Sequence, residues 1–123
     1  MQIHQSAEDY LETILMLSQR MGKVRSIDVV NELGFTKASV SIAMKKLREN
    51  GYIAVDGEGN LTLLEPGREI AERIYSRHRL LTHFFIQLGV DEKTATDDAC
   101  RIEHVISDES FQAIKQYYYQ HKK

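Results

Sequence analysis

The chain has 123 residues, enough for one domain or for two small units that share a core. Hydrophobic residues make up 42% and charged residues 28%, which is typical of a folded soluble protein and argues against a disordered chain. It contains no run of about eighteen apolar residues and no secretory signal, so we expect no contact with membranes. A single cysteine cannot form an internal disulfide, which fits a cytoplasmic protein.

The net charge is only −2, but the charges are unevenly distributed. Six basic and two acidic residues lie between Lys23 and Arg48, whereas seven acidic and two basic residues lie between Asp91 and Glu109. A basic N-terminal half in a chain that is acidic overall indicates a surface for nucleic acid.

Three helices are expected in the first fifty residues. Apolar residues at helical spacing predict the first helix from Ser6, its expected N-cap, to about Met21. The second is expected over residues 26–33, capped by its first residue, and the third over residues 37–50, capped by Thr36.

Two short strands and three further helices are expected after them. Residues 52–64 carry β-branched and aromatic side chains on both sides of "DGEGN", which predicts a hairpin. Pro66 suits the first turn of a long amphipathic helix that continues over residues 67–88. A fifth helix is expected over residues 91–106, capped at its first residue, and a sixth capped by Asp108.

This order of elements, with the short turn "GFT" between the second and third helices, is typical of a winged helix-turn-helix. Lysines on the third helix and a polar hairpin tip suit a recognition helix in the major groove and a wing on the DNA backbone. The alternative is a small helical domain whose lysines form a solvated face. We therefore expect a mainly α protein with a DNA-binding domain over residues 1–64 and a helical domain over residues 65–123.

Two groups of residues have the chemistry of metal ligands. Cys100, Glu103 and His104 lie at positions i, i+3 and i+4, which share one face of a helix. They fit a metal site, or a buried thiol beside two solvated polar residues. Asp9 and Glu12 lie three residues apart in the first helix, which fits metal ligation or helix capping with solvation. Spacing alone leaves both interpretations open for each group.

Four stretches carry a resemblance to a known family: "AEDYLETILML", "ASVSIAMKKLRENGYI", "LTLLEPGREIAERIYSRHRLL" and "DDACRIEHVISDE". They resemble the diphtheria toxin repressor family of metal-dependent bacterial transcription repressors, which includes the manganese transport regulators. The resemblance covers nearly the whole chain and implies a winged helix followed by a helical dimerisation and metal-binding domain. In length the chain resembles the shorter manganese type, so we expect no third, SH3-like domain.

The resemblance also implies six metal ligands, which are Asp9, Glu12, His78, Cys100, Glu103 and His104. Asp9 and Glu12 match the manganese type, whereas Cys100 matches the iron type at a position where the manganese type has glutamate. Thr82 and Thr96 stand where the iron type has a glutamate and a histidine of an ancillary site, so we do not expect that site in that form. Carboxylates suit Mn²⁺ and a thiolate disfavours it, so the ion is expected to be Mn²⁺ or Fe²⁺, with Zn²⁺, Co²⁺ or Ni²⁺ binding in vitro.

The sequence therefore predicts a metal-activated repressor of metal-uptake genes that binds a palindromic DNA operator as a homodimer. The expected DNA contacts come from the recognition helix and from nearby basic residues: Lys23, Arg25, Thr36, Lys37, Ala38, Ser39, Ser41, Lys45 and Lys46. The alternative is a winged-helix regulator that senses an organic ligand or a partner and no metal. We expect no enzyme, because the sequence contains no HExxH motif, nucleophile elbow or phosphate loop.

Overall fold

The computed structural model describes residues 5–122, and the chain divides into two compact units. The first unit extends to Glu72 and the second begins at Arg73, so the division falls inside helix α4 (Glu65–Gln87). The domain boundary expected between residues 64 and 65 stays a prediction.

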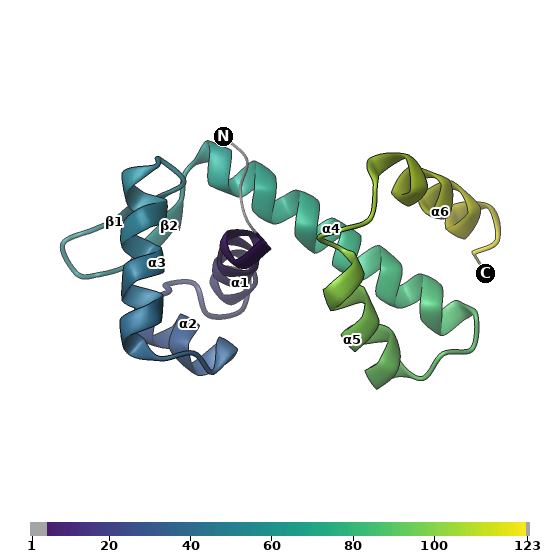
Figure 1. The fold of residues 1–123 in the computed structure, drawn as a ribbon, viewed down its shortest axis with the longest axis horizontal. Coiled ribbons are helices and arrows are strands. Elements are labelled where there is room, and N and C mark those ends of the chain that lie inside the picture. Colours follow the sequence, from purple (N-terminus) through teal and green to yellow (C-terminus); the bar gives the residue numbers. More distant parts are fainter. Residues whose placement is uncertain (1–4, 123) are drawn as a thin grey trace. The chain divides into compact units, whose positions relative to one another are not determined.

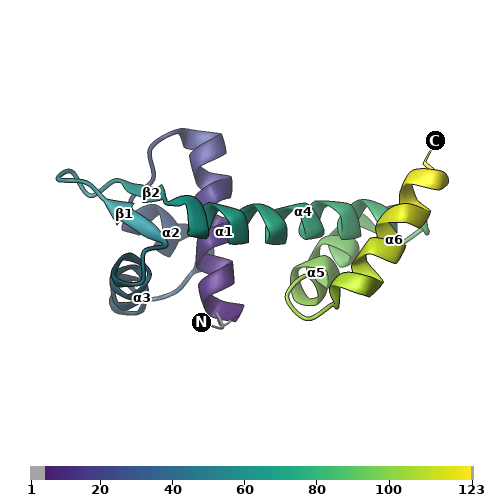
Figure 2. The ribbon, with the colours of Figure 1, turned by 90° about the horizontal axis from the view of Figure 1, so that it is seen from above.

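The first unit is a winged helix-turn-helix, as predicted (Figure 1). It consists of α1 (Gln5–Met21), α2 (Ser26–Leu33), α3 (Lys37–Glu49), β1 (Ile53–Val55), β2 (Leu61–Leu63) and the start of α4. The two strands are antiparallel, and Ile53 pairs with Leu63. In Figure 2 the turn between the strands extends away from the helices of this unit, as the tip of a wing does.

Burial of apolar side chains from each of these elements holds the first unit together. The buried apolar residues of this unit include Leu11, Ile14, Leu15, Val24, Val29, Val40, Met44, Leu47, Ile53, Leu61, Leu63 and Ala71. Gly67 lets the start of α4 approach the hairpin, because a Cβ at this position would collide with the backbone of Tyr52. Strand β1 contacts α3, so the wing lies next to that helix.

The second unit is a three-helix arrangement of the rest of α4, α5 (Glu92–Ile102) and α6 (Asp108–Gln120). Its core is formed by Leu80 and Leu81 of α4, Ala99 of α5 and Phe111 of α6. Five partly buried residues pack against this core: Phe85, Ile102, Ile106, Ile114 and Tyr118. Between residues 5 and 122, none of the helices combines the length and the hydropathy needed to cross a membrane.

Three helix starts differ from the prediction. Helix α1 already includes Gln5, so Ser6 lies inside the helix. The N-cap of α2 is Arg25, one residue before the expected cap, and the carboxylate of Asp28 accepts a hydrogen bond of 2.9 Å from the Arg25 backbone N–H. The hydroxyl of Ser107, the residue before the expected cap, caps α6 by accepting from a backbone N–H of its first turn. Acidic side chains still lie in the first turn of each of these helices, where their negative charge stabilises the positive end of the helix dipole.

Helix α5 is shorter than predicted, and this changes the geometry of the expected ligands. It ends at Ile102 and not at Ile106, with Glu103 as its C-cap. Cys100 therefore lies on the helix, whereas Glu103 and His104 belong to the turn that leads to α6. The expectation that all three lie on one helix is wrong for this reason.

Candidate metal centre and DNA-binding surface

Three of the expected metal ligands lie together in the second unit. His78, in the middle of α4, has its Nδ1 atom 2.9 Å from Oε2 of Glu103. The other carboxylate oxygen, Oε1, is 3.3 Å from Nε2 of His104. The Glu103 side chain is 0% exposed and the His104 side chain 1%. One buried carboxylate therefore lies between two imidazoles.

The chemistry of this cluster fits a divalent metal ion. Imidazole nitrogen and carboxylate oxygen together are ligands for Mn²⁺, Fe²⁺ and Zn²⁺. A carboxylate without solvent contact is costly to keep charged, and a cation or a protonated imidazole close to it offsets that cost. The side chains of Glu103 and His104 are buried, that of His78 is 20% exposed, and all three offer oxygen or nitrogen atoms that can bind a metal.

A buried arginine that the sequence analysis missed fixes the backbone of this cluster. The Nη1 atom of Arg77 donates to the backbone oxygens of Glu103 at 3.3 Å and of Ile106 at 2.9 Å. Glu103 is the C-cap of α5, so the first of these bonds satisfies a carbonyl that has no partner within the helix. A sequence signal for Arg77 exists, because it lies at helical spacing between the fully buried Ile74 and Leu81.

The other expected ligands have different environments. Cys100 is exposed on α5, one turn before Glu103. In the first unit, Glu12 of α1 is buried and Asp9 is half-buried. The alternative of a capping box that starts at Ser6 loses its basis, because Ser6 lies inside the helix. Their ligation of a metal stays a prediction.

The two threonines at the positions of the iron type's ancillary ligands bind backbone atoms of their own helices. Thr82 Oγ1 donates to the carbonyl oxygen of His78 at 2.7 Å, and Thr96 Oγ1 donates to that of Glu92 at 2.9 Å. Neither side chain offers a carboxylate or an imidazole, so an ancillary site of the iron type has no such ligand at these two positions.

The expected DNA-contacting residues lie on the surface of the first unit. Helix α3 buries Val40, Met44 and Leu47 and exposes the opposite face. All nine predicted contact residues are exposed: Lys23, Arg25, Thr36, Lys37, Ala38, Ser39, Ser41, Lys45 and Lys46. The Thr36 hydroxyl also caps α3, because it accepts a hydrogen bond of 3.1 Å from the Ser39 backbone N–H. Its contact with DNA stays a prediction.

A small hollow of about 250 Å³ lies beside this exposed face of α3. It is lined by Ser26, Ser41, Met44, Lys45, Arg48 and Val55. Ser26 and Arg48 are not among the predicted contact residues, although Arg48 belongs to the basic stretch that the charge distribution indicates. The hollow has cations and hydroxyls, which are the groups that proteins use to bind phosphate.

The tip of the wing is fixed by one carboxylate. Asp56 Oδ1 accepts hydrogen bonds of 2.9 Å from the backbone N–H groups of Glu58 and Asn60, and Oδ2 accepts one of 3.0 Å from the Asn60 side chain. The hydrogen bonds from Asn60 are the main reason that the pKa of Asp56 is lowered. Asn60 also forms a β-bridge with Arg25, so this basic residue lies beside the wing.

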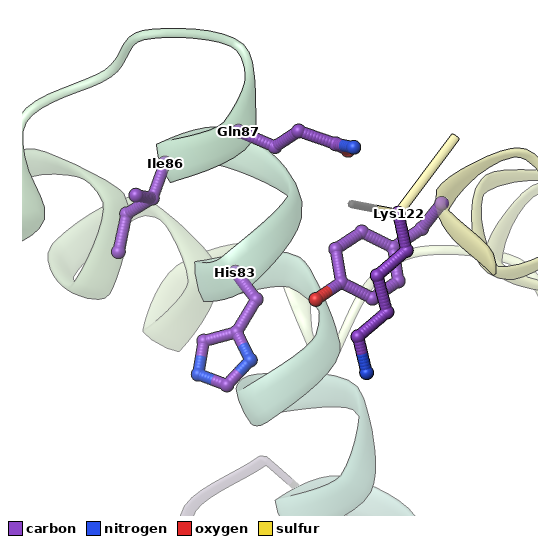
Figure 3. Close-up of a pocket in the computed structure, with 5 residues that line it drawn as sticks. His83, Ile86, Gln87 and Lys122 are labelled. Atoms are coloured by element: carbon purple, nitrogen blue, oxygen red, sulfur yellow. The ribbon is translucent and has the colours of Figure 1, made fainter.

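A second hollow, of about 440 Å³, lies in the C-terminal unit (Figure 3). His83, Ile86 and Gln87 of α4 line it on one side, with Tyr118 and Lys122 on the other. Large apolar side chains are exposed in the same unit, namely Ile86, Leu88, Val105, Tyr117 and Tyr119. None of the expected metal ligands lines this hollow.

Two family models match successive parts of the chain. Residues 2–61 match the family model described as "Iron dependent repressor, N-terminal DNA binding domain". Residues 64–123 match the model described as "Iron dependent repressor, metal binding and dimerisation domain". Together the two matches cover nearly the whole chain.

The chain is also similar to individual regulators and solved structures. It is 35% identical over 113 residues to an uncharacterized HTH-type transcriptional regulator of Methanocaldococcus jannaschii, with 90% of each chain covered. It is 35% identical over 109 residues to the regulator MntR of Bacillus subtilis, covering 89% of this chain and 77% of that one. A manganese-dependent transcriptional repressor solved with manganese is 30% identical, with a TM-score of 0.81 over 90% of this chain and 51% of that one. The metal-dependent regulator MtsR is 27% identical, with a TM-score of 0.82 over 90% of this chain and 52% of that one.

The chain spans about half the length of these two solved structures. The matched half contains both the winged helix and the helical unit with the His78–Glu103–His104 cluster. The chain therefore belongs to the diphtheria toxin repressor family of iron-dependent and manganese-dependent transcriptional repressors.

Proposed function

We propose that this protein represses metal-uptake genes when Mn²⁺ or Fe²⁺ is abundant, by binding a palindromic operator as a homodimer. The observation that carries the proposal is the cluster of His78 and His104 around the buried carboxylate of Glu103, in the part of the chain that matches a metal-binding and dimerisation domain. As a DNA-binding regulator with a single cysteine, it acts in the cytoplasm, and we assign it no enzymatic activity.

The proposed ligand set adds Asp9, Glu12 and Cys100 to this cluster. Asp9 and Glu12 belong to α1, in the DNA-binding unit, whereas the other four ligands belong to the second unit. A single ion bound by both sets links the two units. The three carboxylates and an ionised thiol bring four negative charges to one site, and they repel each other until a cation neutralises them. Metal binding therefore favours the state in which one ion joins both sets of ligands.

This link gives a physical basis for control of DNA binding. An ion that ties α1 to the second unit restricts the position of α3, which packs against α1 in the same unit. In a homodimer the two α3 helices have to match two half-sites of the operator, so restricting each helix raises the affinity for DNA. Such coupling between two sites is typically on the order of 5–150-fold in affinity.

Exposed apolar and aromatic residues of the second unit support the proposed dimer. Ile86, Leu88, Tyr117 and Tyr119 are exposed apolar or aromatic residues, and burying them against a second copy is favourable. A two-fold axis then relates the two recognition helices, as a palindromic operator requires.

The test is an anaerobic titration of the protein with Mn²⁺ or Fe²⁺ that reads metal occupancy and DNA affinity in the same samples. The DNA probe is a sequence selected by the wild-type protein from a random library in the presence of Mn²⁺. His104→Leu removes a ligand atom, whereas leucine fills most of the buried volume of the imidazole. We expect wild type to bind the probe at least about fivefold more tightly with metal, and the variant to lose this increase.

The matched control is His83→Leu, since His83 is an exposed histidine of α4 outside the cluster. This control is expected to behave like wild type. Metal-dependent DNA binding by His104→Leu would show that the cluster is not the switch. DNA binding by wild type that is unaffected by chelation would instead favour a regulator that senses an organic ligand or a partner.

A further inference from the structure

We infer that Arg77 is a positioning residue of the metal centre, which holds the turn of residues 103–106 so that Glu103 and His104 come together. The inference rests on the proposed function, because it concerns the same metal site. Arg77 offers no ligand atom to a metal, since a guanidinium stays protonated and has no acceptor. Its effect on the metal would pass entirely through the backbone of the turn.

The first support is the pair of carbonyl groups that Arg77 binds. Its Nη1 atom bonds to the backbone oxygens of Glu103 and Ile106, at 3.3 and 2.9 Å. These two carbonyls lie on either side of His104 in the sequence. One guanidinium therefore fixes both ends of the segment that carries two of the three clustered side chains.

The second support is that two consecutive residues of α4, Arg77 and His78, both contact Glu103. Arg77 binds the main-chain oxygen of Glu103, and His78, the next residue, approaches its carboxylate at 2.9 Å. Main chain and side chain of this one residue are thus held from two consecutive positions of the same helix.

The third support is the environment that keeps the guanidinium in place. Arg77 is only 5% exposed, so its charge needs compensation. The guanidinium carbon lies 5.3 Å from the centre of the Phe111 ring, and Nη2 lies 3.6 Å from Oδ1 of Asp108. The Asp108 side chain is 77% exposed, and an exposed partner contributes little, so the two carbonyl bonds are the main anchors.

The test compares the metal affinity of four variants. Arg77→Met removes all donors, and Arg77→Lys keeps the charge but replaces the planar fork by one ammonium group. Asp108→Asn weakens only the ion pair. Arg79→Met is the matched control, because Arg79 is an exposed arginine of α4 that lies over the Tyr75 ring.

Two quantities are measured on the 123-residue chain. The first is the dissociation constant for Mn²⁺, from the paramagnetic resonance signal of the free ion. The second is the urea midpoint with and without Mn²⁺. A ligand that binds only the folded state stabilises it by an amount set by its concentration and dissociation constant. A purely structural role of Arg77 would lower both midpoints equally and leave the dissociation constant unchanged.

We expect both Arg77 variants to bind Mn²⁺ about 10–100-fold more weakly, which is the usual effect of removing a group that orients a metal ligand. Asp108→Asn and Arg79→Met are expected to stay close to wild type. A folded Arg77→Lys protein with wild-type Mn²⁺ affinity overturns the inference, and this variant decides the question if Arg77→Met does not fold. Failure of wild type to bind either Mn²⁺ or Fe²⁺ would instead refute the proposed function.

Discussion

His78 and Glu103 are 25 residues apart in the sequence, yet His78 Nδ1 lies 2.9 Å from Glu103 Oε2. This contact joins the middle of α4 to the end of α5, and Arg77 fixes the same turn through its backbone. The fold of the second unit therefore brings His78, Glu103 and His104 together. The remaining proposed ligands, on α1 and at Cys100, can be tested separately from it.

Replacing Cys100 by glutamate is expected to shift the metal preference toward Mn²⁺. A hard carboxylate oxygen replaces a soft sulfur, and Mn²⁺ prefers oxygen ligands. Cys100 is exposed, so the larger side chain causes no overpacking. We expect the ratio of the Mn²⁺ and Fe²⁺ dissociation constants, measured anaerobically, to change about tenfold, which corresponds to about 1.4 kcal/mol.

The control for this prediction is Cys100→Ala, which removes the thiol without adding a ligand. It should weaken the binding of Fe²⁺ and Zn²⁺ more than that of Mn²⁺. Unchanged affinities for all three ions would show that the thiol is not a ligand.

Neutralising the acidic pair of α1 is expected to separate metal binding from DNA binding. In a variant with Asp9→Asn and Glu12→Gln, His78, Glu103 and His104 still hold an ion, but the ion no longer links α1 to the second unit. We expect measurable metal occupancy together with a DNA affinity that metal changes by less than about twofold, well below the usual range for coupled sites.

Glu49→Gln is the matched control for the α1 variant, since Glu49 is an exposed glutamate of the same unit. It should retain the full metal-dependent increase in DNA affinity. If the α1 variant also retained it, these carboxylates would not couple the metal to DNA binding.

The basic face of α3 predicts a salt-dependent contribution to DNA binding. Lys37 and Lys46 are exposed on this helix, and each contact with a phosphate releases counterions. Replacing both by alanine should weaken binding and reduce the slope of log affinity against log salt by up to about 0.9 for each lost contact. Fluorescence anisotropy at several salt concentrations measures this slope.

A double replacement of Lys93 and Lys115 by alanine is the control, because it removes the same charge from the second unit. Its slope is expected to equal that of wild type. Equal slopes for both double variants would show that the basic face of α3 does not contact the DNA backbone.

Protonation of Asp56 in acid is expected to destabilise the turn at the tip of the wing. Its carboxylate accepts hydrogen bonds from Asn60 and Glu58, which lower its pKa below the ordinary value of 3.8. The folded state therefore holds the proton less tightly than the unfolded state. The resulting stabilisation is complete above the unfolded pKa and disappears as the pH falls through the folded pKa.

Comparing wild type with Asp56→Ala tests this dependence. The difference between their urea midpoints should be largest near neutral pH and should shrink as the pH falls below about 3.8. Asp97→Ala serves as an exposed control outside the wing. A difference that stays constant down to acid pH would mean that the negative charge of Asp56 does not stabilise the turn.

The sequence alone determined the features that depend on neighbours a few residues apart. Thr36 and Asp91 were predicted as helix caps, and each accepts a hydrogen bond from a backbone N–H three residues on. The hairpin around "DGEGN" and the start of α4 near Pro66 were predicted by the same kind of local signal. The resemblance to a known family added His78 to the candidate ligands, which helical spacing by itself could not connect with residues 103 and 104.

Only the tertiary structure decided how the second unit builds its part of the site. Helix α5 ends at Ile102, and Arg77 of α4 donates to the carbonyl oxygens of Glu103 and Ile106, just after this end. Helical periodicity continued through Ile106 and gave no sign of this ending, because periodicity records only which face of a helix is apolar. Whether a buried arginine reaches a carbonyl depends on how α4, α5 and α6 pack together. The spacing of residues within one helix does not predict this packing. The position of Glu103 between two imidazoles follows from that packing.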